Sequence, residues 1–212
     1  MDTGFWHQKW EANSIAFHRS EANPLLVNYF KELSLSKGSR IFLPLCGKTL
    51  DIAWLLSNGY RVAGAELVEM AIEQLFAELG IEPQISEIGT IKHYSATNID
   101  ILVGNIFDAT SQMLGIVDAV YDRAALVALP QEMRTRYTAH LTDITNKAPQ
   151  LLISYEYDQQ LMAGPPFSVS NEEVNQHYGN SYTLNLVDSK DVPGGLKGRC
   201  AAKENVWLLQ NN

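Results

Sequence analysis

From Arg40 onward, short apolar runs alternate with helix-length segments whose apolar residues recur every three or four positions. This alternation is typical of repeated strand–helix units, in which a mostly parallel sheet is covered by helices on both faces. The pattern predicts seven strands, at residues 40–45, 61–67, 99–105, 118–122, 150–157, 183–188 and 205–210. It also predicts helices at residues 49–58, 68–79, 131–146 and 170–178, the first two ending at Gly59 and Gly80.

Two segments depart from this alternation. The stretch between Lys92 and Ile99 is too short for a helix, so we expect a β-hairpin-like approach to the third strand. Only the loop at 189–204 separates the last two strands, which should therefore pair antiparallel and leave an antiparallel strand at the sheet edge.

The loop after Asp158 contains Pro165 and Pro166, which prevent a continuous helix. It leaves the carboxyl end of the fifth predicted strand. Ligands bind at this end of open parallel sheets, so the loop is a candidate wall of a binding site.

Composition favours one domain that binds a small molecule. With 212 residues and 46% hydrophobic composition, the chain can bury a sizeable core, and no internal repeat divides it. Its net charge of -8 repels nucleic acid and anionic membranes. No apolar run is long enough to cross a bilayer, and the N-terminus is too polar for a secretory signal. We therefore expect a single cytoplasmic domain, residues 1–212, and nothing in the sequence requires more than a monomer.

The first strand–helix turn contains Gly47, Lys48 and Thr49, which resemble the end of a phosphate-binding loop. That motif needs a glycine five residues before Gly47, where Phe42 stands instead. The dinucleotide motif is also absent, because Gly47 is the only glycine between Gly38 and Gly59. The turn therefore suits a ligand without a pyrophosphate, and Lys48 and Thr49 are interpreted as the start of a helix.

Glu66 ends the second predicted strand, about 20 residues after the first turn, where an acidic residue reaches ribose hydroxyls in nucleotide-binding folds. An adenosine group without a pyrophosphate indicates S-adenosylmethionine. The alternative is that Glu66 merely opens the next helix, where negative charge is favourable.

Four segments, in order, carry a family resemblance: FWHQKWEANSIAFHRSEANPLL from Phe5, LPLCGK from Leu43, DRAALVAL from Asp122 and GPPF from Gly164. Together they resemble the bacterial thiopurine S-methyltransferases over nearly the whole chain. The resemblance implies a Rossmann-like class I methyltransferase fold, with a seven-stranded sheet and an antiparallel last strand. It also implies S-adenosylmethionine as methyl donor, S-adenosylhomocysteine as product and a small thiol as acceptor, with selenium and tellurium acceptors left open.

The same resemblance implies functions for individual residues. The cofactor contacts fall on four residues from separate segments, namely Trp10, Leu45, Glu66 and Arg123. Further cofactor contacts, beside the adenine, are implied for Asn105 and Ile106, and Phe17 is implied in the wall of the substrate pocket.

The last hairpin departs from the family pattern, because its loop is shorter and lacks the arginine that usually precedes the final strand. Lys197 and Arg199 are the candidates to replace it. Substrate preference is the property that this difference affects.

Methyl transfer to a thiol depends mainly on the position of donor and acceptor, and we assign no general base. Arg123 could pair with the cofactor carboxylate or an anionic substrate, or else with Asp118 or Asp122. Trp10 could shield the sulfonium, or pack against Trp6. The aromatic residues of the first 35 positions suggest a lid over the cofactor site.

Metal binding is not expected, because the histidines and cysteines lack the spacing of metal ligands. Cys46 is interpreted as a small buried residue beside the cofactor rather than as a nucleophile. The scattered histidines are His7, His18, His93, His140 and His177.

Two functions remain open on these grounds. The first is a methyltransferase that acts on the sulfur of small thiols. The second is a Rossmann-like protein that binds adenosine ligands without catalysis. The Gly164 to Phe167 loop and Phe17 favour the first, because they add an acceptor side to the cofactor side.

Overall fold

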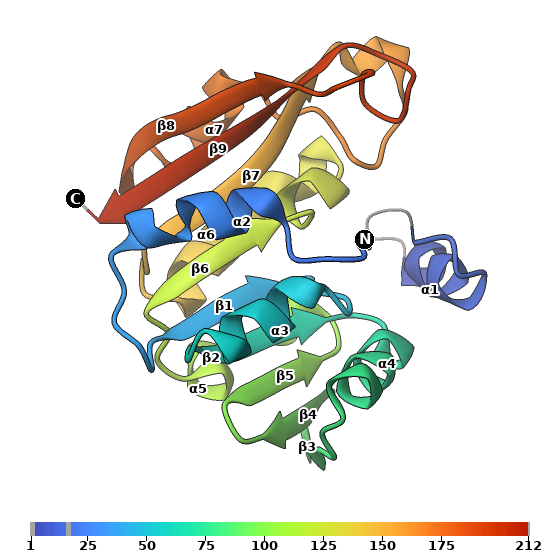
Figure 1. Ribbon diagram of the computed structural model, residues 1–212, viewed down its shortest axis with the longest axis vertical. Coiled ribbons are helices and arrows are strands. Elements are labelled where there is room, and N and C mark those ends of the chain that lie inside the picture. Colours follow the sequence, from blue (N-terminus) through green and yellow to red (C-terminus); the bar gives the residue numbers. More distant parts are fainter. Residues whose placement is uncertain (1–2, 16–17, 212) are drawn as a thin grey trace.

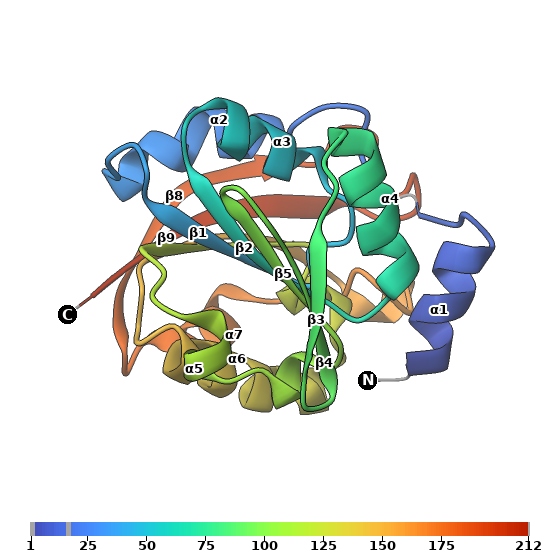
Figure 2. The ribbon, with the colours of Figure 1, turned by 90° about the horizontal axis from the view of Figure 1, so that it is seen from below.

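A twisted sheet of nine strands runs through the computed structural model, which describes residues 3–15 and 18–211 (Figure 1). The strand order is β3-β4-β5-β2-β1-β6-β7-β9-β8. Helices cover both faces of this sheet (Figure 2). The predicted α/β class is thereby confirmed.

Five parallel strands form the centre of the sheet. They match the first five predicted strands to within two residues at each end. In sheet order they are β5 (Ile99–Val103), β2 (Arg61–Glu66), β1 (Arg40–Pro44), β6 (Ala119–Arg123) and β7 (Gln150–Tyr157). The chain passes from β1 to β2 on one side, whereas β6 pairs with the other side of β1. The direction of strand order therefore reverses between β1 and β6, which is where open α/β sheets form ligand crevices.

The sheet continues at one end as an antiparallel hairpin of β3 (Gln84–Ile88) and β4 (Ile91–Ala96), and β4 pairs antiparallel with β5. The predicted approach to the third strand is thus confirmed, but the predicted count of seven strands is wrong. The sequence pattern missed β3 because this edge strand is exposed and mostly polar, so it lacks the apolar run that marks a buried strand.

At the other end of the sheet lie β8 (Tyr182–Asp191) and β9 (Ala202–Asn211). The last strand, β9, pairs antiparallel with both β7 and β8, which confirms the expected reversal. However, β9 lies between these two strands, so the edge position expected for an antiparallel strand belongs to β8.

Two hydrophobic cores flank the sheet. One lies under α2 (Pro24–Tyr29), α3 (Leu50–Ser57) and α4 (Glu69–Leu79), and the other lies under α5 (Ser111–Leu114), α6 (Gln131–Ile144) and α7 (Asn171–Tyr178) (Figure 2). Alternate residues of β1 serve opposite cores, because Ile41 and Leu43 join the first and Phe42 joins the second. All four predicted helices are present, as α3, α4, α6 and α7.

Local capping explains where several helices begin and end. The Thr49 side chain accepts a hydrogen bond from the Asp51 amide at the start of α3, and Ser170 caps α7 by accepting from Glu173. Gly80 closes α4 with a φ of 66°. Short 3-10 turns follow other segments, at η1 (Phe30–Leu33), η2 (Ile106–Asp108), η3 (Leu126–Ala128) and η4 (Gln159–Leu161).

The N-terminal segment divides into two parts. The first helix, α1 (Thr3–Glu11), lies beyond the carboxyl ends of the parallel strands, whereas α2 packs on the sheet (Figure 1). In the described ranges no helix combines the length and apolar character needed to cross a bilayer.

Candidate functional site

A cavity of about 470 Å³ opens at the carboxyl ends of β1, β2, β6 and β7. It lies where the strand order reverses, and its volume falls within the range of small-molecule sites. Residues of α1, the proline loop after β7 and the turn between β8 and β9 also line it. The fold therefore gathers segments from both ends of the chain around one pocket.

The turn after β1 adopts an unusual backbone conformation. Leu45 has a φ of 47° and Gly47 a φ of 52°, both in the left-handed region that non-glycine residues seldom occupy. The Cys46 amide donates to the carbonyl of Ala65 over 3.0 Å, which ties the turn to the end of β2. Backbone strain of this kind is common where a chain curves around a ligand.

Trp10 lies directly against this turn. A Cβ atom added to Gly47 would come within 3.0 Å of the indole ring, so only a glycine permits this approach without a shift. Trp10 is 5% exposed and packs with Val68 and Ala71 at the start of α4. This contact attaches α1 to the rim of the cavity.

Glu66 joins the turn after β1 to the turn after β2. Its carboxylate accepts hydrogen bonds from the Gly47 amide at 2.7 Å and from the Val68 amide at 2.9 Å. Burial raises the pKa of Glu66, although these amide donors oppose the shift. A carboxylate has about four acceptor sites, so it retains capacity for hydroxyl donors from a ligand.

Arg123 is the last residue of β6 and lines the opposite side of the cavity. The next residue, Ala124, has a φ of 61°, so this strand also ends in a strained turn. Burial raises the pKa of the nearby Tyr155, as does Glu204, while the charges of Arg123 and Arg19 act against that rise.

The far end of the cavity is walled by the proline loop and the β8–β9 turn. Gly164, Pro165 and Pro166 line it, and Lys197 donates from Nζ to the Pro165 carbonyl over 2.7 Å. Tyr157 donates from its hydroxyl to the Pro166 carbonyl, also over 2.7 Å. Burial lowers the pKa of Lys197, and neighbouring positive charges lower it further.

The lining is cationic although the chain as a whole is acidic. Lysine and arginine side chains contribute five of the lining residues, which are Lys9, Arg19, Lys48, Arg123 and Lys197. The lining carboxylates are Asp51 and Glu66. Asp51 is already bonded to the Asn23 amide and the Tyr121 hydroxyl, and Lys48 pairs with Glu78 at 2.6 Å. With Lys48 paired, the other lysine and arginine side chains of the described lining still outnumber its two carboxylates, so the field favours an anionic group in the cavity.

Four residues expected at the cofactor, Trp10, Leu45, Glu66 and Arg123, all line this one cavity. Asn105 and Ile106 do not. Ile106 is buried in the core, and Asn105 caps η2 by accepting from the Phe107 amide. They adjoin the site through Gly104, whose amide donates to the Glu66 carbonyl. Phe17 lies outside the described residues.

Cys46 lines the cavity as a buried thiol. Burial and the neighbouring Glu66 raise its pKa well above the usual value, so the thiol stays protonated at neutral pH. This environment matches a small packing residue and not a nucleophile. Within residues 3–15 and 18–211, no group of three or more histidine, cysteine, aspartate or glutamate side chains is placed to hold a metal ion.

Sequence reasoning missed several residues that line the cavity, among them Lys9, His18, Arg19 and Tyr155. Tyr155 stands near the carboxyl end of β7, a position that could have flagged it. The pKa of His18 is lowered, chiefly by burial and also by Lys48 and Arg123. The predicted lid includes Lys9 and Arg19, but no local signal distinguishes these two residues from the rest of the N-terminal segment.

Comparison with known proteins gives consistent results. The family model for thiopurine S-methyltransferase matches residues 1–212. The chain is 54% identical to a thiopurine S-methyltransferase of Xanthobacter autotrophicus over 99% of both chains. It is 50% identical to one of Teredinibacter turnerae, over 100% of this chain and 99% of the relative.

Among solved structures, one similar fold is the 1,6-didemethyltoxoflavin-N1-methyltransferase of Burkholderia thailandensis. It has a TM-score of 0.67 and 15% identity, and the match covers 99% of this chain and 87% of that one. An S-adenosylmethionine-dependent methyltransferase from Anabaena variabilis has a TM-score of 0.63 and 14% identity, with 99% and 95% covered. These structural matches support the Rossmann-like methyltransferase fold.

Proposed function

We propose, from the premise that the chain belongs to the thiopurine S-methyltransferase family of S-adenosylmethionine-dependent methyltransferases, that it methylates the sulfur of small aromatic and heterocyclic thiols such as thiopurines. One observation carries the proposal. A single cavity is lined both by Trp10, Leu45, Glu66 and Arg123 and by the Gly164 to Pro166 loop. The first set suits the cofactor and the second suits an acceptor beside it.

The lining residues fit S-adenosylmethionine. Glu66 offers a buried carboxylate for ribose hydroxyls, and the hydrogen bonds that it accepts from the Gly47 and Val68 amides hold it in place. Arg123 offers a permanently charged fork for the methionine carboxylate. Trp10 places an aromatic ring beside the turn, where it can shield a cation. The turn has neither motif that binds phosphate chains, which agrees with a ligand of this kind.

Methyl transfer to sulfur needs a correctly placed thiolate more than a strong base. The cofactor, when bound, supplies an activated methyl group on a sulfonium. A free thiol has a pKa of about 8.5, and positive charges such as those of Arg19 and Lys197 lower such a value. The chain would therefore bind the acceptor as an anion, orient it and exclude water. Selenium and tellurium acceptors, whose anions form more readily, fall within the same chemistry.

Tryptophan fluorescence tests the cofactor site. S-adenosylhomocysteine should change the intrinsic fluorescence of the wild-type chain, because Trp10 lines the cavity, whereas NADH should not bind. The response should be weaker in Trp10→Phe, in which Trp6 of the cavity lining remains, and unchanged in Trp54→Phe, since Trp54 packs against Phe30 in the core. A response to NADH alone would contradict the methyltransferase assignment.

Transfer itself is tested with a labelled methyl donor and an aromatic thiol. The wild-type chain should label the thiol, and Arg123→Ala should weaken this activity. Binding of S-adenosylhomocysteine without transfer to any thiol would instead favour a non-catalytic adenosine-binding protein. Equal activity in wild type and Arg123→Ala would remove Arg123 from the site.

A further inference from the structure

We propose that Arg134 is a positioning residue for methyl transfer, which fixes from outside the cavity the two segments that wall its acceptor end. One segment contains Val127 and Ala128, and the other runs from Gly164 to Pro166. The inference rests on the proposed function, because it assigns the acceptor to this end of the cavity.

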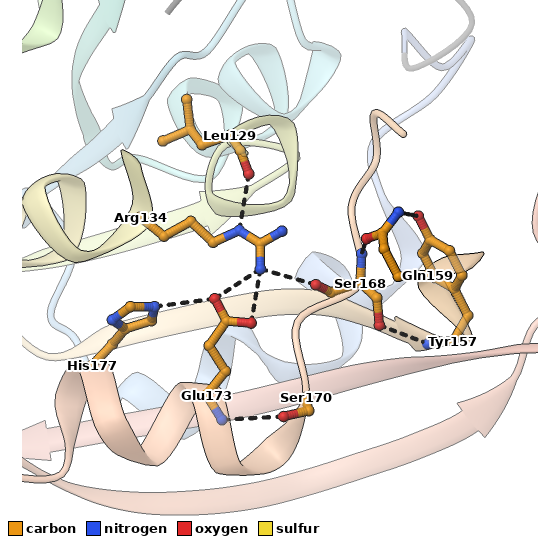
Figure 3. A network of polar contacts seen from close by, with 8 residues as sticks. All are labelled: Leu129, Arg134, Tyr157, Gln159, Ser168, Ser170, Glu173 and His177. Carbon is orange, nitrogen blue, oxygen red and sulfur yellow. Dashed lines mark hydrogen bonds and ion pairs between the residues drawn. The ribbon is translucent and has the colours of Figure 1, made fainter. Parts of the chain in front are cut away.

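Arg134 projects from α6 and bonds to both segments. Its Nε donates to the Leu129 carbonyl over 2.9 Å, directly after the lining residues of η3. Its Nη1 donates to the Ser168 carbonyl, also over 2.9 Å, two residues after Pro166 (Figure 3). The planar guanidinium therefore sets the distance between two walls that are far apart in the sequence.

The guanidinium is itself held in a fixed place. Glu173 of α7 accepts from Nη1 at 2.7 Å and 2.8 Å, one contact to each carboxylate oxygen. The His177 ring lies 3.2 Å from the same carboxylate, and Ser170 accepts from the Glu173 amide (Figure 3). The Arg134 side chain is only 3% exposed, so water does not compete for these bonds.

Several hydrogen bonds hold the acceptor loop at the point where Arg134 contacts it. The Phe167 amide donates to the Val127 carbonyl over 2.6 Å, which joins the two walls directly. Ser168 donates from its amide to Gln159 and accepts at its hydroxyl from the Tyr157 amide (Figure 3). Arg134 also lies over the Phe167 ring, 5.7 Å from its centroid. A shift of the guanidinium would therefore move the loop as a unit.

Stability alone does not explain a buried ion pair at this place. Removing two charges from water is costly, and an apolar pair of similar volume often stabilises a fold as well or better. Both charges nevertheless lie behind the acceptor wall, where the fork binds two carbonyls that an apolar side chain could not bind. This placement points to geometry as the role of the pair.

The test compares Arg134→Met/Glu173→Met, which removes both charges together, with Arg136→Met as the matched control. Arg136 lies on the same helix but stacks on Phe107, 4.0 Å from the ring centroid, away from the acceptor loop. The paired variant should lose about tenfold or more in kcat/KM for the thiol, because a displacement of about 1 Å can cost roughly a hundredfold. Its Kd for S-adenosylhomocysteine should stay within about twofold of the wild type, and Arg136→Met should match the wild type in both.

Arg134→Lys provides a second test if the paired variant folds poorly. Lysine keeps the charge opposite Glu173 but lacks the fork, so KM for the thiol should rise while the cofactor constants stay unchanged. Unchanged thiol kinetics in a folded variant, or an equal loss of thiol and cofactor binding, would overturn the positioning role.

Hydrogen exchange separates this inference from the proposed function. The Phe167 and Ser168 amides should exchange faster in the paired variant than in the wild type or Arg136→Met, whether or not the chain is active. Unchanged protection of these amides would overturn the inference on its own. Absence of transfer by the wild-type chain would instead count against the proposed function.

Discussion

Replacing Glu66 by glutamine tests the central contact of the site. The carboxylate accepts from the Gly47 and Val68 amides and keeps further lone pairs toward the cavity. A glutamine side chain has one oxygen where the carboxylate has two. If that oxygen serves one backbone amide, its own NH₂ group faces the other, and two donors then oppose each other.

The expected magnitude follows from these bonds. A hydrogen bond to a charged group contributes about 1.5 to 3 kcal/mol, and about 1.4 kcal/mol corresponds to a tenfold change in affinity. Loss of the charged partner of the ribose should therefore weaken binding of S-adenosylhomocysteine roughly ten- to hundredfold. The unfavourable burial that raises the pKa of Glu66 is relieved in the variant, so the fold should lose less free energy than the ligand complex does.

Isothermal titration calorimetry with S-adenosylhomocysteine measures the effect, with Glu69→Gln as the control. Glu69 begins α4 three residues later and bonds to Lys92 and Tyr94 rather than lining the cavity. Glu69→Gln should bind like the wild type. Wild-type affinity in Glu66→Gln would refute the ribose role, and equal weakening in both variants would mean that the start of α4 has loosened.

Two further perturbations address the turn and a buried carboxyl group. Gly47→Ala and Gly38→Ala should each cost about 1 to 2 kcal/mol, because both glycines have positive φ. Circular dichroism melting should show similar losses of stability, but only Gly47→Ala should weaken binding of S-adenosylhomocysteine, since its Cβ meets Trp10 at 3.0 Å and Gly38 has nothing within 4 Å. For Asp122, burial raises the pKa from 3.8 to about 6, so between these values the folded chain holds a proton that the unfolded chain releases. Protonation of Asp122 therefore stabilises the fold at low pH. About 3 kcal/mol of unfolding free energy is lost as the pH rises from 3.8 to about 6. Asp122→Asn should therefore gain that amount relative to the wild type between about pH 4 and pH 6 in denaturant titrations, and parallel pH profiles would contradict the burial argument.

The sequence predicted those parts of the fold that depend on neighbouring residues. The helix at 50–57 begins after Thr49 and the helix at 171–178 after Ser170, because each side chain caps the amides that follow it. Buried strands appear as apolar runs, so the five central strands were found nearly to the residue. The edge strand at 84–88 was missed because its residues are exposed and its pairing partner supplies the only constraint on it.

The candidate site likewise combines features that the sequence predicted with contacts that it did not. The position of Glu66 at the end of a strand, and the absence of any glycine besides Gly47 in the first turn, already indicated an adenosine ligand without a pyrophosphate. These features are local, since they depend on how a strand meets the following helix. The sequence did not indicate that the same carboxylate holds the Gly47 amide, which is 19 residues away.

What only the tertiary structure decided is how distant segments meet around the cavity. Arg134 reaches Ser168 and Glu173 across 34 and 39 residues, and these contacts leave no periodic trace in the sequence. Hydrophobic patterning records which face of an element is buried, because burial repeats along a strand or helix. A single polar contact between distant segments does not repeat, so it becomes visible only when the packed sheet brings those segments together.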